Sequence, residues 1–260
     1  MPVFLIFRAR HLTARPQNGE NVDFSLDIFA CFRPGIFAYN PIKVRSMPIS
    51  SEIKQYPAKV AKILREHYPH AKCELDFHTP LQLLIATILS AQCTDERVNL
   101  VTKTLFLKYP DTAAYANAPL KELERDIQST GFYHNKAKSI QSCCQALLER
   151  YEGRVPQDIE TLIELPGIGR KTANVVLGTA FGVASGIVVD THVTRVSQRL
   201  GLTQEKNPEK IEKDLLGQFP QAEWIAISNR IVHHGRYVCT ARKPKCNTCP
   251  LGSICPRIGV

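Results

Sequence analysis

Apolar residues recur along most of the chain with the period of an α-helix, and turn residues separate one periodic segment from the next. The segment 81–92, LQLLIATILSAQ, is apolar on almost every face and therefore predicts a central buried helix. Thr79 supplies its N-cap and Pro80 its first position, and Thr94 can cap the helix that follows. Because no strand-like alternation persists from residue 50 onward, the predicted fold class is all-α.

The other periodic segments carry helix boundaries of the same kinds. Pro119 precedes one segment and Gly131 follows it, while Asp190 and Asn207 stand where N-caps are expected. These signals place a helix in each interval between turns, which leaves little room for any other regular structure. The further helices expected are 95–108, 120–130, 137–151, 158–165, 170–180, 193–200, 210–219 and 222–235.

Two of these apolar segments meet at the turn LPGIGRK. Gly167 and Gly169 permit positive φ and close approach of another backbone, so successive amides of the turn and of the next helix can point outward together. An ordinary corner between two helices is the alternative for a bare PGxG, but the adjacent Arg170 and Lys171 favour a phosphate site. We therefore expect Gly167, Gly169 and Arg170 to bind backbone phosphate, which fixes register without reading sequence.

Basic residues clearly outnumber acidic ones. The 260 residues include 33 Lys and Arg against 24 Asp and Glu, which gives a formal net charge of +9. A polyanion is the expected partner, although charge alone does not separate nucleic acid from an anionic membrane surface. No apolar run approaches the roughly 18 residues that span a bilayer, so the sequence predicts no membrane span.

Nine cysteines fall into two groups. Five are scattered, form no disulfide framework and are expected to act as small buried hydrophobes in a reducing compartment. Four lie within CTARKPKCNTCPLGSIC in the pattern C-x6-C-x2-C-x5-C, where four thiolates can close one site; zinc and an iron-sulfur cluster both remain open. The scattered residues are Cys31, Cys73, Cys93, Cys143 and Cys144, and the metal ligands expected are Cys239, Cys246, Cys249 and Cys255.

Several stretches resemble one known family. LPGIGRKTA with VDTHV downstream, together with SAQCTD and GFYHNKA, resembles the helix-hairpin-helix DNA glycosylases and, within them, the endonuclease III family. The likeness runs from about Met47 to Pro256. It implies one 4Fe-4S cluster on the four C-terminal cysteines, with no bond chemistry assigned to that cluster. The domains it implies are a six-helix barrel at 73–183, containing the hairpin at 159–178, and a smaller helical cluster domain at 47–72 and 184–260.

The resemblance also gives catalytic roles to Lys171 and Asp190. It implies that Lys171 attacks the sugar C1′ of a flipped-out nucleotide and that Asp190 assists. An attacking amine must be unprotonated, and a free lysine with a pKa near 10.4 is neutral only about once in 2,500 molecules at pH 7. A helix N-terminus, neighbouring Arg170 and burial beneath an extruded base all disfavour the ammonium. The alternatives are a solvated lysine that touches phosphate and an aspartate that only caps a helix.

Residues of three further stretches are expected to contact DNA. By resemblance, Gln92 in SAQCTD and Phe132 in GFYHN fill and wedge the gap that nucleotide flipping leaves, although a core position is the alternative for Phe132. Arg242, Lys243 and Lys245 lie inside the first loop of the cysteine motif, and no acidic residue follows Glu223. We expect this loop to bind phosphates rather than to be merely solvated.

The sequence therefore predicts a bifunctional DNA repair enzyme. It would remove oxidised or damaged pyrimidines from duplex DNA and nick the abasic site by β-elimination through a lysine Schiff base. The alternatives are a non-catalytic iron-sulfur DNA-binding redox sensor and a monofunctional mismatch glycosylase, which usually lacks a lysine at this position. We expect a monomer in the cytoplasm, associated with the nucleoid. Residues 1–46 have no clear amphipathic period and are expected to be a disordered extension, a start-site artefact or a targeting segment.

Overall fold

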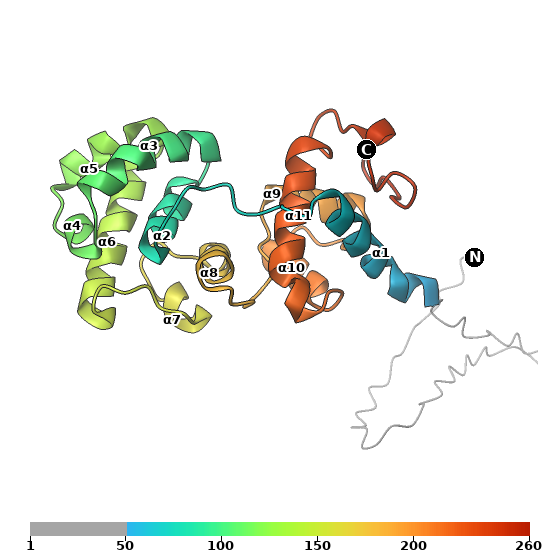
Figure 1. Ribbon diagram of the computed structural model, residues 1–260, viewed down its shortest axis with the longest axis horizontal. Coiled ribbons are helices and arrows are strands. Elements are labelled where there is room, and N and C mark those ends of the chain that lie inside the picture. The colour runs from blue at the N-terminus through green and yellow to red at the C-terminus, as the bar shows by residue number, and fades with distance from the viewer. Residues whose placement is uncertain (1–50) are drawn as a thin grey trace, which may run out of the picture. The chain divides into compact units, whose positions relative to one another are not determined.

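The computed structural model describes residues 51–260, with side chains from residue 55 onward (Figure 1). The expectations for residues 1–46 concern a segment outside this range. Residues 51–260 belong to one compact unit. Every regular element in the described range is a helix, which confirms the all-α prediction. Within the same range, no helix is both long and apolar enough to cross a membrane.

The first group of helices surrounds α2 (Pro80–Leu89), which contacts α3, α6 and α8. Thr79 caps α2, its hydroxyl accepting from the Gln82 amide at 3.2 Å, and all seven residues from Leu83 to Leu89 are buried, so the central buried helix is confirmed. One continuous hydrophobic core joins the helices of this group. The others are α3 (Asp95–Lys108), α4 (Thr112–Ala116), α5 (Leu120–Asp126), α6 (Tyr133–Tyr151), α7 (Ile159–Ile163) and α8 (Arg170–Val176).

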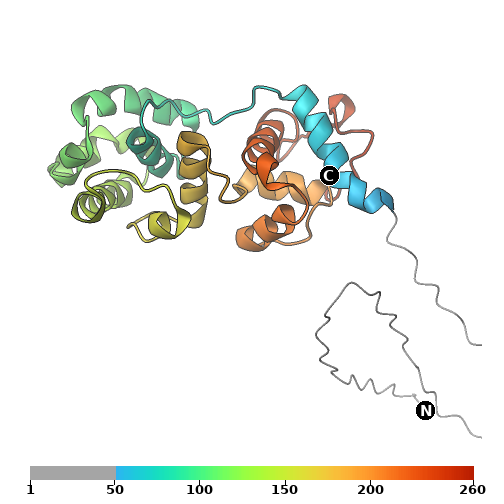
Figure 2. The same ribbon diagram turned by 60° about the horizontal axis from the view of Figure 1, so that its bottom comes forward.

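A second group packs around α11 (Trp224–Tyr237), which contacts α9 and α1. Its core is a separate cluster of buried residues, which includes Val193, Ile227 and Ile231. Segments from both ends of the described range build this group, and Figure 2 shows it beside the first group. The division into domains at residues 72/73 and 183/184 stays a prediction. The other helices of the group are α1 (Ser51–His67), α9 (Thr191–Arg199) and α10 (Pro208–Leu216).

The structure adds α1 to the expected helices and departs from them in three further places. The segment 120–130 breaks into α5 and a short 3₁₀ turn, and the five-residue helix α4 was not expected; the Asp111 carboxylate caps it by accepting from the Ala114 amide at 2.8 Å. The expected helix 170–180 changes after Val176 into a π-helical turn, Leu177–Phe181. Gly178 in this turn lies against Ile225 of α11, so the irregular turn brings the two helix groups into close contact.

The scattered cysteines are buried to different degrees. Cys143 and Cys144 on α6 are fully buried, as predicted, whereas Cys73 and Cys93 are only partly buried, and Cys31 lies outside the described residues. Burial raises the pKa of Cys143 to about 12 and raises the pKa of Cys144 as well. Because the thiolate is the nucleophile, these two thiols are inert at neutral pH.

We expect Cys143 and Cys144 to resist alkylation by iodoacetamide in the folded protein at mildly alkaline pH, because both are buried and protonated. Peptide mass spectrometry after timed labelling measures this, with Cys93 as the partly buried comparison. In guanidinium chloride all three should react alike. Rapid labelling of Cys143 under native conditions would contradict the packing of α6.

Candidate active site

The two residues predicted to be catalytic line one pocket. Lys171 of α8 and Asp190 at the start of α9 both border a pocket of about 860 Å³, which lies between the two helix groups. Ser90 after α2 and Arg236 of α11 also line it, so both groups contribute to its wall. Gln92, Phe132 and the basic residues of the cysteine motif are not among its lining residues.

Lys171 is the second residue of α8 and its side chain is exposed. Among the described residues it takes part in no ion pair, so its amine is available to a ligand in the pocket. The N-cap of α8 is Gly169, which has no side chain to cap the first amides. The first turn of α8 therefore presents a primary amine and unshielded backbone N–H groups together.

The hairpin turn before α8 requires glycine at one of its two glycine positions. Gly167 has φ +78°, and a Cβ there would lie 2.8 Å from the Cβ of Ser139 on α6. Both the backbone conformation and the packing therefore exclude a side chain. Gly169 has φ −93° and open space around it, so glycine is not sterically required there. Because Gly169 has no side chain, the N-terminus of α8 stays open to an anion.

Asp190 caps α9 with one carboxylate oxygen. Its Oδ1 accepts hydrogen bonds from the amides of His192 and Val193, both at 2.8 Å. Its Oδ2 makes no hydrogen bond to any described residue, and the half-buried side chain lines the pocket. The capping interpretation is confirmed, and the second oxygen remains available for a different task.

Arg170 has a partner within the protein. Its Nε donates to Oε2 of Glu212 on α10 at 2.8 Å, and the Glu212 carboxylate raises the pKa of Arg170 above its ordinary value. Asn174, one turn further along α8, donates to the other oxygen of Glu212 at 3.0 Å, and the Ser185 hydroxyl donates to Asn174 at 2.8 Å. This buried network fixes the first turns of α8, and with them the backbone of Lys171, against α10.

Sequence reasoning missed Glu212 and Asn174. Both side chains are nearly fully buried, Asn174 at 3% and Glu212 at 5% exposure. The one available signal was their polarity at positions where the helical period predicts apolar residues. A buried carboxylate needs partners, so such positions indicate a contact whose other side lies elsewhere in the sequence.

A second polar cluster joins the helix groups at the pocket wall. Arg236 of α11 donates through Nη2 to Asp95 of α3 at 2.8 Å and through Nη1 to Glu74. The Tyr237 hydroxyl also donates to Glu74, at 3.1 Å. Arg236, Asp95 and Glu74 all line the pocket. They connect α11 with the start of α3 and with the segment before α2, which helps to hold the two walls of the pocket together.

Gln92 and Phe132 share an unusual conformation. Both have left-handed backbones, with φ 53° and φ 47°, and both side chains are exposed, Phe132 at 63%. The core alternative for Phe132 is therefore wrong. A left-handed conformation of a bulky residue costs about 1–3 kcal/mol and persists where the surroundings enforce it, often at functional sites.

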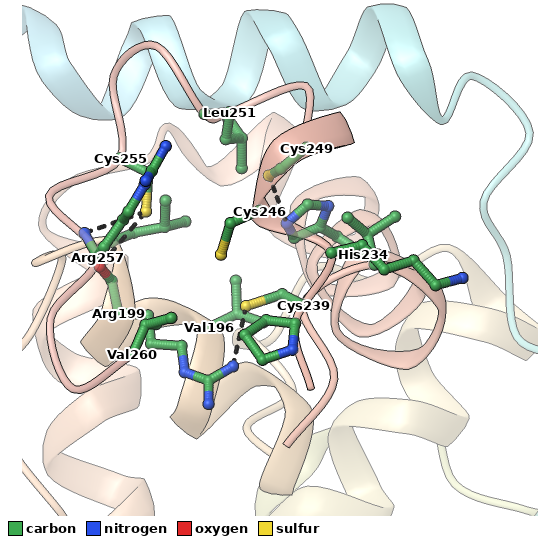
Figure 3. Close-up of a pocket in the computed structure, with 15 residues that line it drawn as sticks. Val196, Arg199, His234, Cys239, Cys246, Cys249, Leu251, Cys255, Arg257 and Val260 are labelled. Atoms are coloured by element: carbon green, nitrogen blue, oxygen red, sulfur yellow. Dashed lines mark hydrogen bonds between the residues drawn. The ribbon is translucent and has the colours of Figure 1, made fainter. Parts of the chain in front are cut away.

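The four C-terminal cysteines surround a pocket of about 400 Å³ (Figure 3). In the described range no three His, Cys, Asp or Glu side chains converge closely enough to hold a single metal ion. A zinc ion with Zn–S bonds of about 2.3 Å would draw its thiolates to roughly 3.8 Å from one another. Four thiolates that line one pocket can also hold a polynuclear cluster, in which they bind different iron atoms. The residues are Cys239, Cys246, Cys249 and Cys255.

One guanidinium group and one backbone amide donate to two of these sulfurs. Nη1 of Arg199 donates to Sγ of Cys239 at 3.3 Å and to the Thr240 carbonyl at 2.8 Å. The Arg257 amide donates to Sγ of Cys255 at 3.4 Å. Such contacts orient the thiolates and offset their negative charge when a cluster is bound.

The first loop of the cysteine motif exposes three cations while its backbone is held. The Thr240 hydroxyl donates to the Lys243 carbonyl at 2.7 Å, and the Lys245 amide donates to the Val238 carbonyl at 3.0 Å. The side chains of Arg242, Lys243 and Lys245 are exposed and form no ion pair with any described residue. A fixed backbone with unpaired cations suits binding to a polyanion.

Comparisons with known proteins identify the family of this chain. The family model for HhH-GPD superfamily base excision DNA repair proteins matches residues 85–221, and the iron-sulfur binding domain of endonuclease III matches residues 239–255. The endonuclease III of Synechocystis sp. is 55% identical over 203 residues, which are 78% of this chain and 93% of the relative. The chain belongs to the endonuclease III family.

Other members of the endonuclease III family are also similar. The Bacillus subtilis endonuclease III is 50% identical over 189 residues, 72% of this chain and 86% of the relative. A solved structure of a trapped endonuclease III–DNA covalent intermediate is 47% identical, with a TM-score of 0.76, and the match covers 78% of this chain and 96% of that one. As a member of this family the chain is a DNA glycosylase of base excision repair that carries an iron-sulfur cluster, rather than zinc.

We expect the change Gly186→Ala to lower the melting temperature by several degrees, corresponding to about 1–3 kcal/mol. A Cβ at Gly186 would lie 2.1 Å from Oε1 of Glu212 and 2.6 Å from Nδ2 of Asn174, so it would force the buried network apart. Thermal unfolding monitored by circular dichroism measures the change. Gly217→Ala is the matched control, because its nearest atom is 3.6 Å away. Equal stability of both variants would contradict the network's role.

Proposed function

We propose that this protein is a bifunctional enzyme that removes oxidised or ring-damaged pyrimidines from duplex DNA and then nicks the abasic site. The observation that carries the proposal is the position of Lys171 at the start of the hairpin helix, where its exposed amine lines the same pocket as Asp190. The trapped covalent intermediate of a 47% identical endonuclease III supports covalent chemistry with DNA for this chain as well.

Lys171 is the nucleophile of the first step, and its Schiff base makes the second step possible. The lone pair of its Nζ forms a bond to the sugar C1′, the glycosidic C–N bond breaks, and the base leaves with the bonding electrons and takes up a proton. Opening of the sugar ring gives a Schiff base between Nζ and C1′. This acidifies the C2′ proton. As solvent water takes up that proton, a C2′=C3′ double bond forms and the C3′–O bond breaks, so the 3′ phosphate leaves by β-elimination and the strand is nicked.

Asp190 assists with the oxygen that does not cap α9. Its Oδ2 accepts the proton that Lys171 releases and stabilises the positive charge that develops at C1′ as the base departs. The cap at Oδ1 supports this role, because two amide hydrogen bonds fix the carboxylate within the pocket. A capping aspartate is thereby also an oriented base.

The hairpin and the cysteine motif bind the DNA backbone. The open amides at Gly167 and Gly169 grip a phosphate, while Arg170, engaged by Glu212, keeps a side chain that is 44% exposed and remains a candidate contact. Arg242, Lys243 and Lys245 add phosphate contacts from the cysteine loop. We propose that the duplex lies across the cleft between the two helix groups and therefore contacts both surfaces.

Gln92 and Phe132 enter the duplex where the damaged nucleotide leaves it. Their exposure and strained backbones support insertion, because a side chain held out from the core is ready to fill a gap in the base stack.

The enzyme acts as a monomer on this account. Family membership does not favour the redox-sensor or mismatch-glycosylase alternatives, and Lys171 itself argues against the second.

The four cysteines of the C-terminal motif hold the 4Fe-4S cluster. All four line one pocket, within the residues that match the iron-sulfur binding domain. The cluster's ligation fixes the basic loop, and four protein ligands leave no iron coordination site for substrate. The ligands are Cys239, Cys246, Cys249 and Cys255.

We expect borohydride to trap a covalent complex between the protein and DNA that contains an abasic site. Lys171→Ala should abolish trapping, whereas Asp190→Asn should retain the α9 cap and DNA binding but lower turnover by about 10²–10⁴-fold. Denaturing gel electrophoresis and single-turnover kinetics measure these effects. Lys138→Ala, an exposed lysine on α6, serves as the charge-matched control. Trapping that persists in Lys171→Ala would place the nucleophile elsewhere.

Removal of one cation from the cysteine loop should weaken DNA binding uniformly across sequences. Each of Arg242→Ala, Lys243→Ala and Lys245→Ala is expected to reduce the slope of log affinity against log salt concentration by about 0.9, because one phosphate contact is lost. Fluorescence anisotropy over a salt series measures the slope, and Lys103→Ala on α3 is the control. An unchanged slope in all three variants would mean that the loop is only solvated.

A further inference from the structure

Lys136 on α6 is a buried lysine for which the proposed reaction has no role. It is 5% exposed, and its ammonium forms no ion pair with any carboxylate of the described residues. Lysine is rarely buried in this way, because removing an ammonium from water is costly unless hydrogen bonds replace its hydration. Burial correspondingly lowers the pKa of Lys136. Its two partners in the protein are therefore informative.

Both partners are backbone carbonyls next to the loops that we propose to insert. Nζ of Lys136 donates to the Leu89 carbonyl at 2.8 Å and to the Thr130 carbonyl at 2.8 Å. Leu89 is the last residue of α2 and precedes Gln92 by three positions; Thr130 ends the 3₁₀ turn and precedes Phe132 by two. One ammonium thus joins two segments that lie about 40 residues apart in the sequence.

The chemistry of these contacts favours a rigid connection. Carbonyls at helix ends lack partners within the helix and carry partial negative charge, so a cation is favourable there. Charge-assisted hydrogen bonds in a buried site are stronger than exposed ones. Gln92 and Phe132, which have left-handed backbones, come two or three residues after these carbonyls in the sequence. Such backbone strain persists only where neighbouring structure enforces it.

We propose that Lys136 is a positioning residue that holds the two insertion loops at a fixed separation, so that Gln92 and Phe132 enter the duplex together. The inference rests on the proposed function of those two side chains. Lys136 contacts neither DNA nor the reacting atoms in this arrangement. Its loss therefore impairs the opening of paired DNA more than the chemistry at a sugar that is already accessible.

The test compares strand nicking at an abasic site in duplex DNA with nicking at the same site in single-stranded DNA, which needs no insertion. Lys136→Met in the full holoprotein should slow duplex nicking about tenfold or more, because loop misplacement is costly, and single-strand nicking less than about threefold. Lys136→Arg, which retains donors, should recover part of the duplex rate. Lys138→Met, on the exposed face of the same helix, should change neither the duplex nor the single-strand nicking rate.

The outcomes separate the two ideas. An equal loss on both substrates in Lys136→Met would indicate a merely structural lysine and overturn the inference. If wild-type protein nicks neither substrate, the proposed lyase function fails instead. Visible absorbance of the iron-sulfur cluster and the melting temperature show whether each variant is folded.

A double-mutant cycle provides a test that does not need the methionine variant to fold. Gln92→Ala and Phe132→Ala, alone and together in the wild-type background, are measured on duplex DNA. We expect their effects on the nicking rate to be strongly non-additive, because both side chains depend on one fixed spacing. Additive effects would overturn the inference. If Lys136→Arg folds, the same cycle in that background should retain most of the coupling.

Discussion

The carboxylate of Glu212 is the contact on which the geometry of the site most depends. It accepts hydrogen bonds from Arg170 and Asn174, and so holds the first turns of α8 against α10. Lys171 lies between these two anchor positions, while its own side chain stays exposed. The protein therefore fixes the backbone of the proposed nucleophile without using the amine for any structural bond. A flexible α8 would leave the same amine without a defined direction of attack.

Other sites in the molecule are built in the same way: contacts hold the backbone, while the side-chain atom proposed to act makes no contact within the protein. Asp190 caps α9 with one oxygen and leaves the other toward the pocket, and the cysteine loop is held by carbonyl contacts while its cations stay exposed. Gln92 and Phe132 are exposed on left-handed backbones, and Lys136 donates hydrogen bonds to carbonyls three and two residues before them. Each functional group is thus positioned by contacts that do not involve its reactive atoms.

Local chemistry explains which parts of this arrangement could be predicted from sequence. Thr79 and Asp190 act on amides two or three residues away, so a short stretch of sequence contains both partners of each cap. Glu212, Lys136 and the π-helical turn at Leu177–Phe181 depend instead on contacts between distant segments. In the sequence the two partners of each contact lie far apart. Each partner alone is seen only as an unexplained polar residue or an ordinary glycine.

The distribution of carboxylates decides where the positive charge can act. Glu212 forms an ion pair with Arg170. Glu74 and Asp95 form ion pairs with Arg236, so both guanidinium groups are already engaged within the protein. No acidic residue follows Glu223 in the sequence, and the cations of the cysteine loop consequently have no neighbouring carboxylate along the chain. Positive charge is therefore uncompensated by any acidic residue along this stretch of the chain. A polyanion that binds there meets cations that need not first break an ion pair, which makes the loop a better electrostatic anchor than the paired arginines near the pocket.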